Sequence, residues 1–137
     1  RGRNAAVVAA VVDLLSDKDI QNQAIETLQT IAPTDRSNAQ MAAAALIPLF
    51  ENKLISFRSK VSNALAAMGR DAVTPLTQAL SNADPGIRLG AADTLSQIGK
   101  LAKKRDTIRE LTRCARTDNI VQVRQACQSA LYRIQAR

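Results

Sequence analysis

Apolar residues recur along the chain with the spacing of one helical face. The segment 84–99 reads DPGIRLGAADTLSQIG, and its main apolar positions are Ile87, Ala91, Leu95 and Ile98. Their spacing of i, i+4, i+8 and i+11 brings the side chains to one side of an α-helix. An Asp-Pro pair opens the segment and a glycine closes it, as is typical of helix ends. The pattern therefore predicts a helix.

The same pattern occurs in three other parts of the chain. The equivalent positions are Phe57, Val61, Leu65 and Met68; Val123, Cys127, Leu131 and Ile134; and Ile20, Ala24, Leu28 and Ile31. Another apolar-periodic segment precedes each of these helices, at 4–16, 38–51, 71–81 and 106–117. Short polar breaks separate the segments. The pattern thus predicts eight helices in four hairpins, with repeats at roughly 4–33, 37–69, 71–99 and 106–136.

A repeat of this length indicates an all-α fold, an α-solenoid that forms a single domain over residues 1–137. The composition fits, because alanine is frequent, aromatic residues make up only 2% and tryptophan is absent. The first helix, NAAVVAAVVDLL, is apolar on almost every side, whereas a surface helix needs a polar face. We therefore expect the C-terminal part of a longer array. Cover by a partner is the alternative, and an exposed repeat edge of this kind should make the isolated chain self-associate.

Residue types argue against catalysis. The chain has no histidine, which removes the commonest general base and metal ligand, and its glycines form no phosphate-binding motif. We expect no enzyme activity, no metal and no cofactor. Cys114 and Cys127 lie 13 residues apart without a CxxC motif, so we expect two buried or half-buried free thiols in a cytoplasmic protein. No apolar run approaches the about 20 residues that a membrane span needs.

The segment 71–99, DAVTPLTQALSNADPGIRLGAADTLSQIG, resembles a HEAT repeat, closest to the short bacterial type of phycobilisome-lyase-like HEAT proteins. The resemblance implies a structural ladder in which an Asn or Asp of the turn between two helices pairs with an arginine six residues later. The matching pairs are Asn52 and Arg58, Asn82 and Arg88, and Asp118 and Arg124. The first repeat departs from this pattern, because Gln21 replaces the arginine and Leu15 replaces the turn residue.

The resemblance also implies that the second helix of each hairpin lines a concave wall. Residues predicted to point outward there include Asn63, Asp93, Ser129 and Tyr132. These side chains are mostly small and polar, with a slight acidic excess. They suit hydrogen bonding to an extended segment or a helix of another protein. We therefore expect a non-catalytic protein-interaction scaffold.

A second candidate surface is basic. Residues 1–99 carry nine Lys or Arg and nine Asp or Glu, whereas residues 100–137 carry ten and three, a net charge of +7. The predicted basic patch comprises Lys103, Lys104, Arg105, Arg109, Arg113 and Arg116. Such a patch can hold nucleic acid, another polyanion or an acidic protein. Asp106 and Glu110 lie beside it and can pair with its arginines. A third alternative, a bilin lyase-type subunit, follows only from the resemblance.

Overall fold

The computed structural model describes residues 4–137 and is helical throughout. Residues 1–3 of the predicted domain lie outside the described part. The α-helices are α1 (Ala5–Asp13), α2 (Gln21–Ile31), α3 (Arg36–Leu46), α4 (Ile55–Met68), α5 (Arg70–Ala79), α6 (Pro85–Ile98), α7 (Arg105–Thr117) and α8 (Val121–Gln135). Three short 3-10 helices follow some of them: η1 (Leu14–Ser16), η2 (Ile47–Glu51) and η3 (Gly99–Ala102). Residues 4–137 contain no strand, so the predicted all-α solenoid of eight helices is confirmed.

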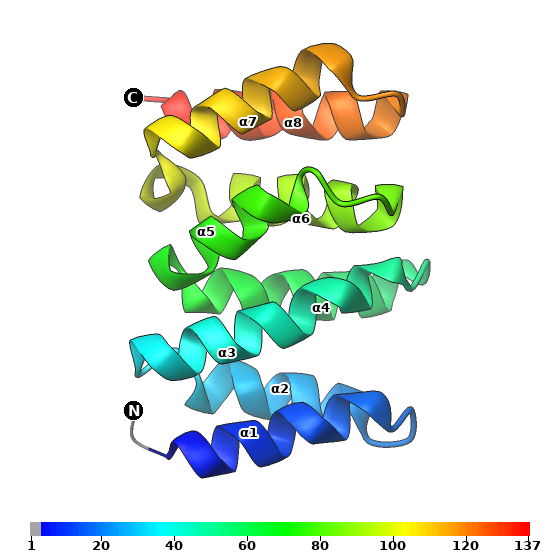
Figure 1. The fold of residues 1–137 in the computed structure, drawn as a ribbon, viewed down its shortest axis with the longest axis vertical. Helices are drawn as coiled ribbons and strands as arrows, with labels where there is room; N and C mark the ends of the chain where they lie inside the picture. The colour runs from blue at the N-terminus through cyan, green and yellow to red at the C-terminus, as the bar shows by residue number, and fades with distance from the viewer. Residues whose placement is uncertain (1–3) are drawn as a thin grey trace.

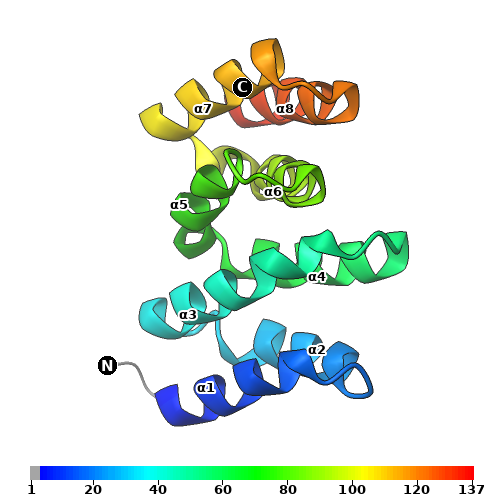
Figure 2. The same ribbon diagram turned by 45° about the vertical axis from the view of Figure 1, so that its right-hand side comes forward.

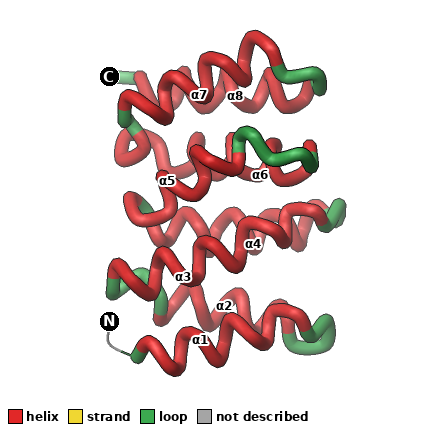
Figure 3. The backbone as a smooth tube through the Cα atoms, in the orientation of Figure 1, coloured by secondary structure: helices red, strands yellow, loops and turns green. Residues whose placement is uncertain are grey.

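The helices form four antiparallel hairpins that stack in chain order along the long axis of the molecule (Figure 1). Helices α1, α3, α5 and α7 make one layer, and α2, α4, α6 and α8 make the other, as the turned view shows (Figure 2). Short loops join the helices at both edges (Figure 3). Each hairpin packs against the next, and the buried apolar residues form one continuous core along the stack.

Local sequence explains where helices begin and end. The Asp84 carboxylate accepts hydrogen bonds from the N–H groups of Gly86 and Ile87, at 2.7 and 3.3 Å, and Pro85 occupies the first turn of α6. Gly69 and Gly99 have φ angles of 58° and 70°, which other residues rarely adopt. The predicted start and end of α6 are therefore confirmed, and α4 ends at a glycine in the same way.

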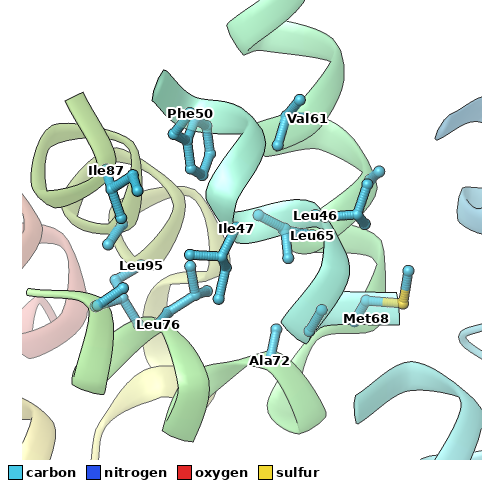
Figure 4. Packing of buried hydrophobic residues seen from close by; sticks show 14 of the residues in the cluster. Leu46, Ile47, Phe50, Val61, Leu65, Met68, Ala72, Leu76, Ile87 and Leu95 are labelled. Atoms are coloured by element: carbon cyan, nitrogen blue, oxygen red, sulfur yellow. The ribbon is translucent and has the colours of Figure 1, made fainter. Parts of the chain in front are cut away.

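The centre of the stack is a close-packed aliphatic core (Figure 4). Phe50, in η2 between the two helices of the second hairpin, projects toward the third hairpin and packs directly on Gly90 of α6. A Cβ atom at position 90 would overlap the phenyl ring, so the glycine inside this helix is required by the approach of Phe50. Glycine at this position destabilises the helix by about 1 kcal/mol relative to alanine. Its lack of a side chain leaves the space that the Phe50 ring occupies.

Buried hydroxyl groups also join neighbouring hairpins. Thr77 of α5 and Thr107 of α7 form a hydrogen bond of 2.8 Å between their side chains. Ser62 of α4 and Thr94 of α6 form another of 2.9 Å in the other layer. Both layers are therefore held together by polar contacts as well as by apolar packing.

The two cysteines contradict the sequence-based expectation. Cys114 of α7 and Cys127 of α8 form a disulfide, with Cα atoms 6.0 Å apart, and are not free thiols. Both face the interior of the same hairpin and are buried, as their apolar spacing predicts. Because the antiparallel helices place them opposite each other, they can bond across the hairpin despite their wide sequence separation. Cysteine usage therefore no longer favours a reducing compartment.

Helix α1 exposes apolar surface at the end of the stack. Val8 is fully buried, whereas Val7 of α1 is 53% exposed and Leu14 of the adjoining η1 is 43% exposed. The apolar face predicted for this helix is thus open in the described chain. Within residues 4–137, no helix combines the length and the apolar character needed to cross a membrane.

Removal of the disulfide should lower stability measurably. Replacing Cys114 and Cys127, which lie 13 residues apart, with alanine frees the loop between them in the unfolded chain, which should cost about 3 kcal/mol of unfolding free energy. Denaturant unfolding of wild type with and without reductant, beside the double variant, measures the effect. Reductant should destabilise only the wild type. An unchanged wild-type midpoint would contradict the bond's contribution.

Candidate interaction surfaces

The predicted ladder residues lie at the turn between the two helices of each hairpin. In three hairpins the side-chain oxygen of Asn52, Asn82 or Asp118 accepts a hydrogen bond from the N–H group two residues later, at 2.8 to 3.0 Å. This closes a local turn before the second helix starts. The arginine six residues on donates to the backbone carbonyl of the same turn residue, at 3.3, 3.0 and 2.6 Å in the three hairpins.

Two of these arginines also reach the next hairpin. Arg58 donates to the carbonyl of Gly86 at 2.8 Å, and its guanidinium lies 5.2 Å from the centre of the Phe50 ring. Arg88 binds both carboxylate oxygens of Asp118, at 2.8 and 3.1 Å. The side chains of Arg88 and Asp118 are only 12% and 7% exposed. Each arginine therefore closes its own turn and fixes the position of the next one.

The first hairpin keeps part of this arrangement without an arginine. The side-chain amide of Gln21 donates to the carbonyl of Leu15 at 2.9 Å, again across six residues. The local turn is made by Asp17, whose carboxylate accepts from the N–H of Asp19. Although Gln21 replaces the arginine, the first hairpin therefore keeps a hydrogen bond from this side chain to a carbonyl of its turn. Within residues 4–137, the Gln21 side chain forms no hydrogen bond with the second hairpin.

Opposing effects set the pKa of Asp118. Burial raises it, but hydrogen bonds from Arg88 and from the Ile120 N–H, together with the charges of Arg88 and Arg124, lower it more. The pKa therefore lies below its ordinary value of 3.8. The ionised carboxylate stabilises the fold at neutral pH, and this contribution is lost as pH falls through the lowered pKa.

The four residues predicted for partner binding all lie exposed on the second-helix face, the solvent side of α2, α4, α6 and α8. The structure divides them between two hollows. Asn63 and Asp93 line a pocket of about 300 Å³ between α4 and α6. Ser129 and Tyr132 line a wider hollow of about 460 Å³ between α6 and α8. The Tyr132 side chain is 78% exposed, so its ring is available to a partner.

Sequence reasoning missed the side chains that complete the first hollow. The Ser62 hydroxyl donates to the Gln97 side-chain oxygen at 3.0 Å, and the Gln97 amide donates to the Asn63 oxygen at 3.0 Å. These bonds cross from α4 to α6. Their residues come from different repeats, and no pattern within one repeat pairs them.

Asp93 stands in a less favourable environment. Removal of water by its surroundings raises the pKa of the carboxyl group, and the nearby charge of Arg58 offsets only part of this rise. No described residue donates a hydrogen bond to Asp93 or forms an ion pair with it within 4 Å. The second-helix face therefore contains a carboxylate with unused acceptor capacity.

Two arginines of the predicted basic patch are already paired with acidic side chains. Arg109 pairs with Asp106 at 3.2 Å, and Arg113 pairs with Glu110 at 2.7 Å, as their spacing predicts. The hydrogen bond from Arg113 is the main cause of a lowered Glu110 pKa. The remaining members of the patch, Lys103, Lys104, Arg105 and Arg116, are exposed and form no ion pair with a described residue.

Two adjoining clefts extend this basic surface beyond the last hairpin. One, of about 470 Å³ between α5 and α7, is lined by Lys104, Arg105 and Arg109. The other, of about 250 Å³, is lined by Arg36, Arg70 and again Lys104. Arg36 and Arg70 were not among the predicted residues. They join the patch because parallel α3, α5 and α7 place their first turns at one edge.

Comparison with known proteins identifies the repeat type. A family model described as HEAT repeats matches residues 43–132, more than half of the chain. No curated protein and no solved structure gives a significant match. The relationship to the phycobilisome-lyase-like type stays a prediction. In residues 4–137, no group of three or more acidic or cysteine side chains is arranged to hold a metal ion.

Asp118→Asn should test the ionic contact while keeping the local turn, because asparagine occupies this turn position in two other hairpins. We expect a loss of about 1–3 kcal/mol of unfolding free energy at pH 7. The difference from wild type should shrink as pH falls below 3.8. Denaturant unfolding from pH 3 to pH 7 measures it, with Asp13→Asn as the control. A pH-independent difference would contradict the role of the charge.

Proposed function

The chain belongs to the HEAT-repeat family, and we propose that it is a non-catalytic scaffold that binds another protein along its second-helix face. The observation that carries the proposal is the pair of neighbouring hollows on this face. One lies between α4 and α6 and the other between α6 and α8. A partner segment that crosses the helices would fill both in succession.

The character of the hollows suits a protein ligand. They offer hydroxyl, amide and carboxylate groups for hydrogen bonds, and Leu89 and Tyr132 supply apolar contact area. Helix axes in contact lie about 8–10 Å apart, and an extended chain rises about 3.3 Å per residue. Residues about three positions apart in an extended segment would therefore reach adjacent hollows.

The rigid ladder supports this function. Arg58 and Arg88 fix successive turns relative to each other, so the hollows between the second helices are held at constant separation. A binding face that is already ordered loses little conformational entropy when a partner docks. HEAT repeats are widely used for protein interaction, and membership of the family favours this class of function.

A second candidate function is binding of a polyanion such as nucleic acid. The observation that favours it is the continuity of the two basic clefts, which share Lys104 and reach from α7 to α3. Contacts of this kind would bind phosphates without reading base sequence. The positive charge of these clefts is partly neutralised by the acidic residues that also line them, Asp71, Asp106 and Glu110. For this reason we rank protein binding above polyanion binding.

Peptides selected from a random display library test the scaffold function. Peptides that bind wild type should lose binding to a variant with Asn63→Arg and Ser129→Arg, because the added side chains occupy both hollows. A control with Ser37→Arg and Gln40→Arg adds the same charge to α3 and should bind normally. Fluorescence anisotropy measures the affinities. Equal affinities for all three proteins would place binding elsewhere and contradict the proposal.

Titration of labelled duplex DNA and single-stranded RNA tests the second function. The variant with Lys103, Lys104 and Arg105 changed to glutamate should lose binding, and wild-type affinity should fall steeply with salt. The control changes Lys18, Lys53 and Lys60 to glutamate, which alters the net charge equally. Absence of binding at low salt, or equal loss in both variants, would eliminate the polyanion function.

A further inference from the structure

The pocket between α4 and α6 combines apolar walls with one carboxylate. Its apolar lining includes Ile55 of α4, Leu89 of α6 and Phe50 of η2. Ile55, the first residue of α4, is 79% exposed, so its side chain is open to an incoming ligand. Asp93 is the only acidic residue among those that line the pocket.

The other charged and amide groups of this pocket are already engaged. Arg58 donates hydrogen bonds to the carbonyls of Phe50, Asn52 and Gly86, which hold its guanidinium at the turn edge. The Gln97 and Asn63 side chains bind each other. The internal network therefore leaves Asp93 without a donor.

This carboxylate has unused acceptor capacity in a partly water-depleted position. An ionised carboxylate has two acceptor oxygens, and nothing in residues 4–137 donates to them. The raised pKa of Asp93 agrees with this geometry, since partial removal of water disfavours ionisation and the Arg58 charge offsets only part of this effect. A cationic donor entering the pocket would relieve that cost.

We propose that the pocket receives an arginine side chain of the partner protein, with Asp93 accepting two hydrogen bonds from its guanidinium. The proposal rests on the scaffold function stated above. A guanidinium matches a carboxylate through paired parallel N–H groups. Its planar, weakly hydrated surface and aliphatic stem also pack well on side chains such as Leu89 and Ile55, whereas a lysine ammonium is strongly hydrated.

Arg58 opposes the incoming cation and limits the affinity of the site. It is the one basic residue that lines the pocket, and its charge already acts on Asp93. An isolated arginine should therefore bind only at millimolar concentration. The same side chain within a longer peptide gains from contacts in the neighbouring hollow beside Tyr132.

Nuclear magnetic resonance with two small probes tests the pocket directly. N-acetylarginine methylamide should shift the amide signals of Ser59, Leu89 and Asp93 in the nitrogen-15-labelled protein. The citrulline analogue has nearly the same shape but no charge, and it should shift them little. Asp93→Asn should weaken the arginine probe about tenfold, because the charge-assisted pair is lost. The control Glu26→Gln removes a carboxylate from α2 on the same face and should leave the response unchanged.

The outcomes separate this inference from the scaffold function. Equal shifts with both probes, no localised shift, or an unchanged response in Asp93→Asn would overturn the arginine pocket. If one of these results is found but library-selected peptides still lose binding to the variant with Asn63→Arg and Ser129→Arg, the scaffold function stands and only the partner chemistry is wrong. If selected peptides ignore both hollows but the arginine probe binds through Asp93, the scaffold function fails and the pocket remains.

Discussion

The structure depends on one repeated contact, a guanidinium at a helix-hairpin turn that binds backbone carbonyls. A carbonyl near the end of a helix has no partner within that helix and carries partial negative charge. Arg58 satisfies such groups in its own hairpin and reaches the carbonyl of Gly86 in the next. Arg88 extends the same contact to the carboxylate of Asp118. Apolar packing makes the hairpins adhere, but these bonds determine how one is positioned on another.

The contact also shapes the second-helix face. Once the turns are fixed, α4, α6 and α8 must lie at set distances, and the side chains between them decide whether a groove stays open. Small residues keep the helices close, as where Gly90 receives the Phe50 ring. Larger exposed side chains, such as Tyr132, then stand at the rim of hollows instead of filling them. A scaffold obtains its binding surface from this combination of fixed spacing and incomplete filling.

Sequence periodicity predicted all eight helices and the helix-ending glycines, because these depend on neighbours within a few residues. It could not predict contacts between residues on different helices. The Cys114–Cys127 bond depends on two inward positions meeting across a hairpin, and their separation alone indicated free thiols. The isolation of Asp93 depends on where Arg58 and Gln97 direct their donors. For the same reason Arg36 and Arg70, distant in sequence from the basic patch, joined it only in the folded chain.

The spacing between turn residue and arginine is six in three hairpins, whereas the junctions between hairpins differ from the single Gly69 to the segment 99–104. The two edges of the stack are therefore under different physical constraints on length. An inserted residue between Asn82 and Arg88 would pull the guanidinium out of reach of two turns at once. An insertion after α6 only lengthens a loop, as η3 already does. Length variation among related arrays should accumulate along the junction edge, which makes that edge the natural place for new segments to be added.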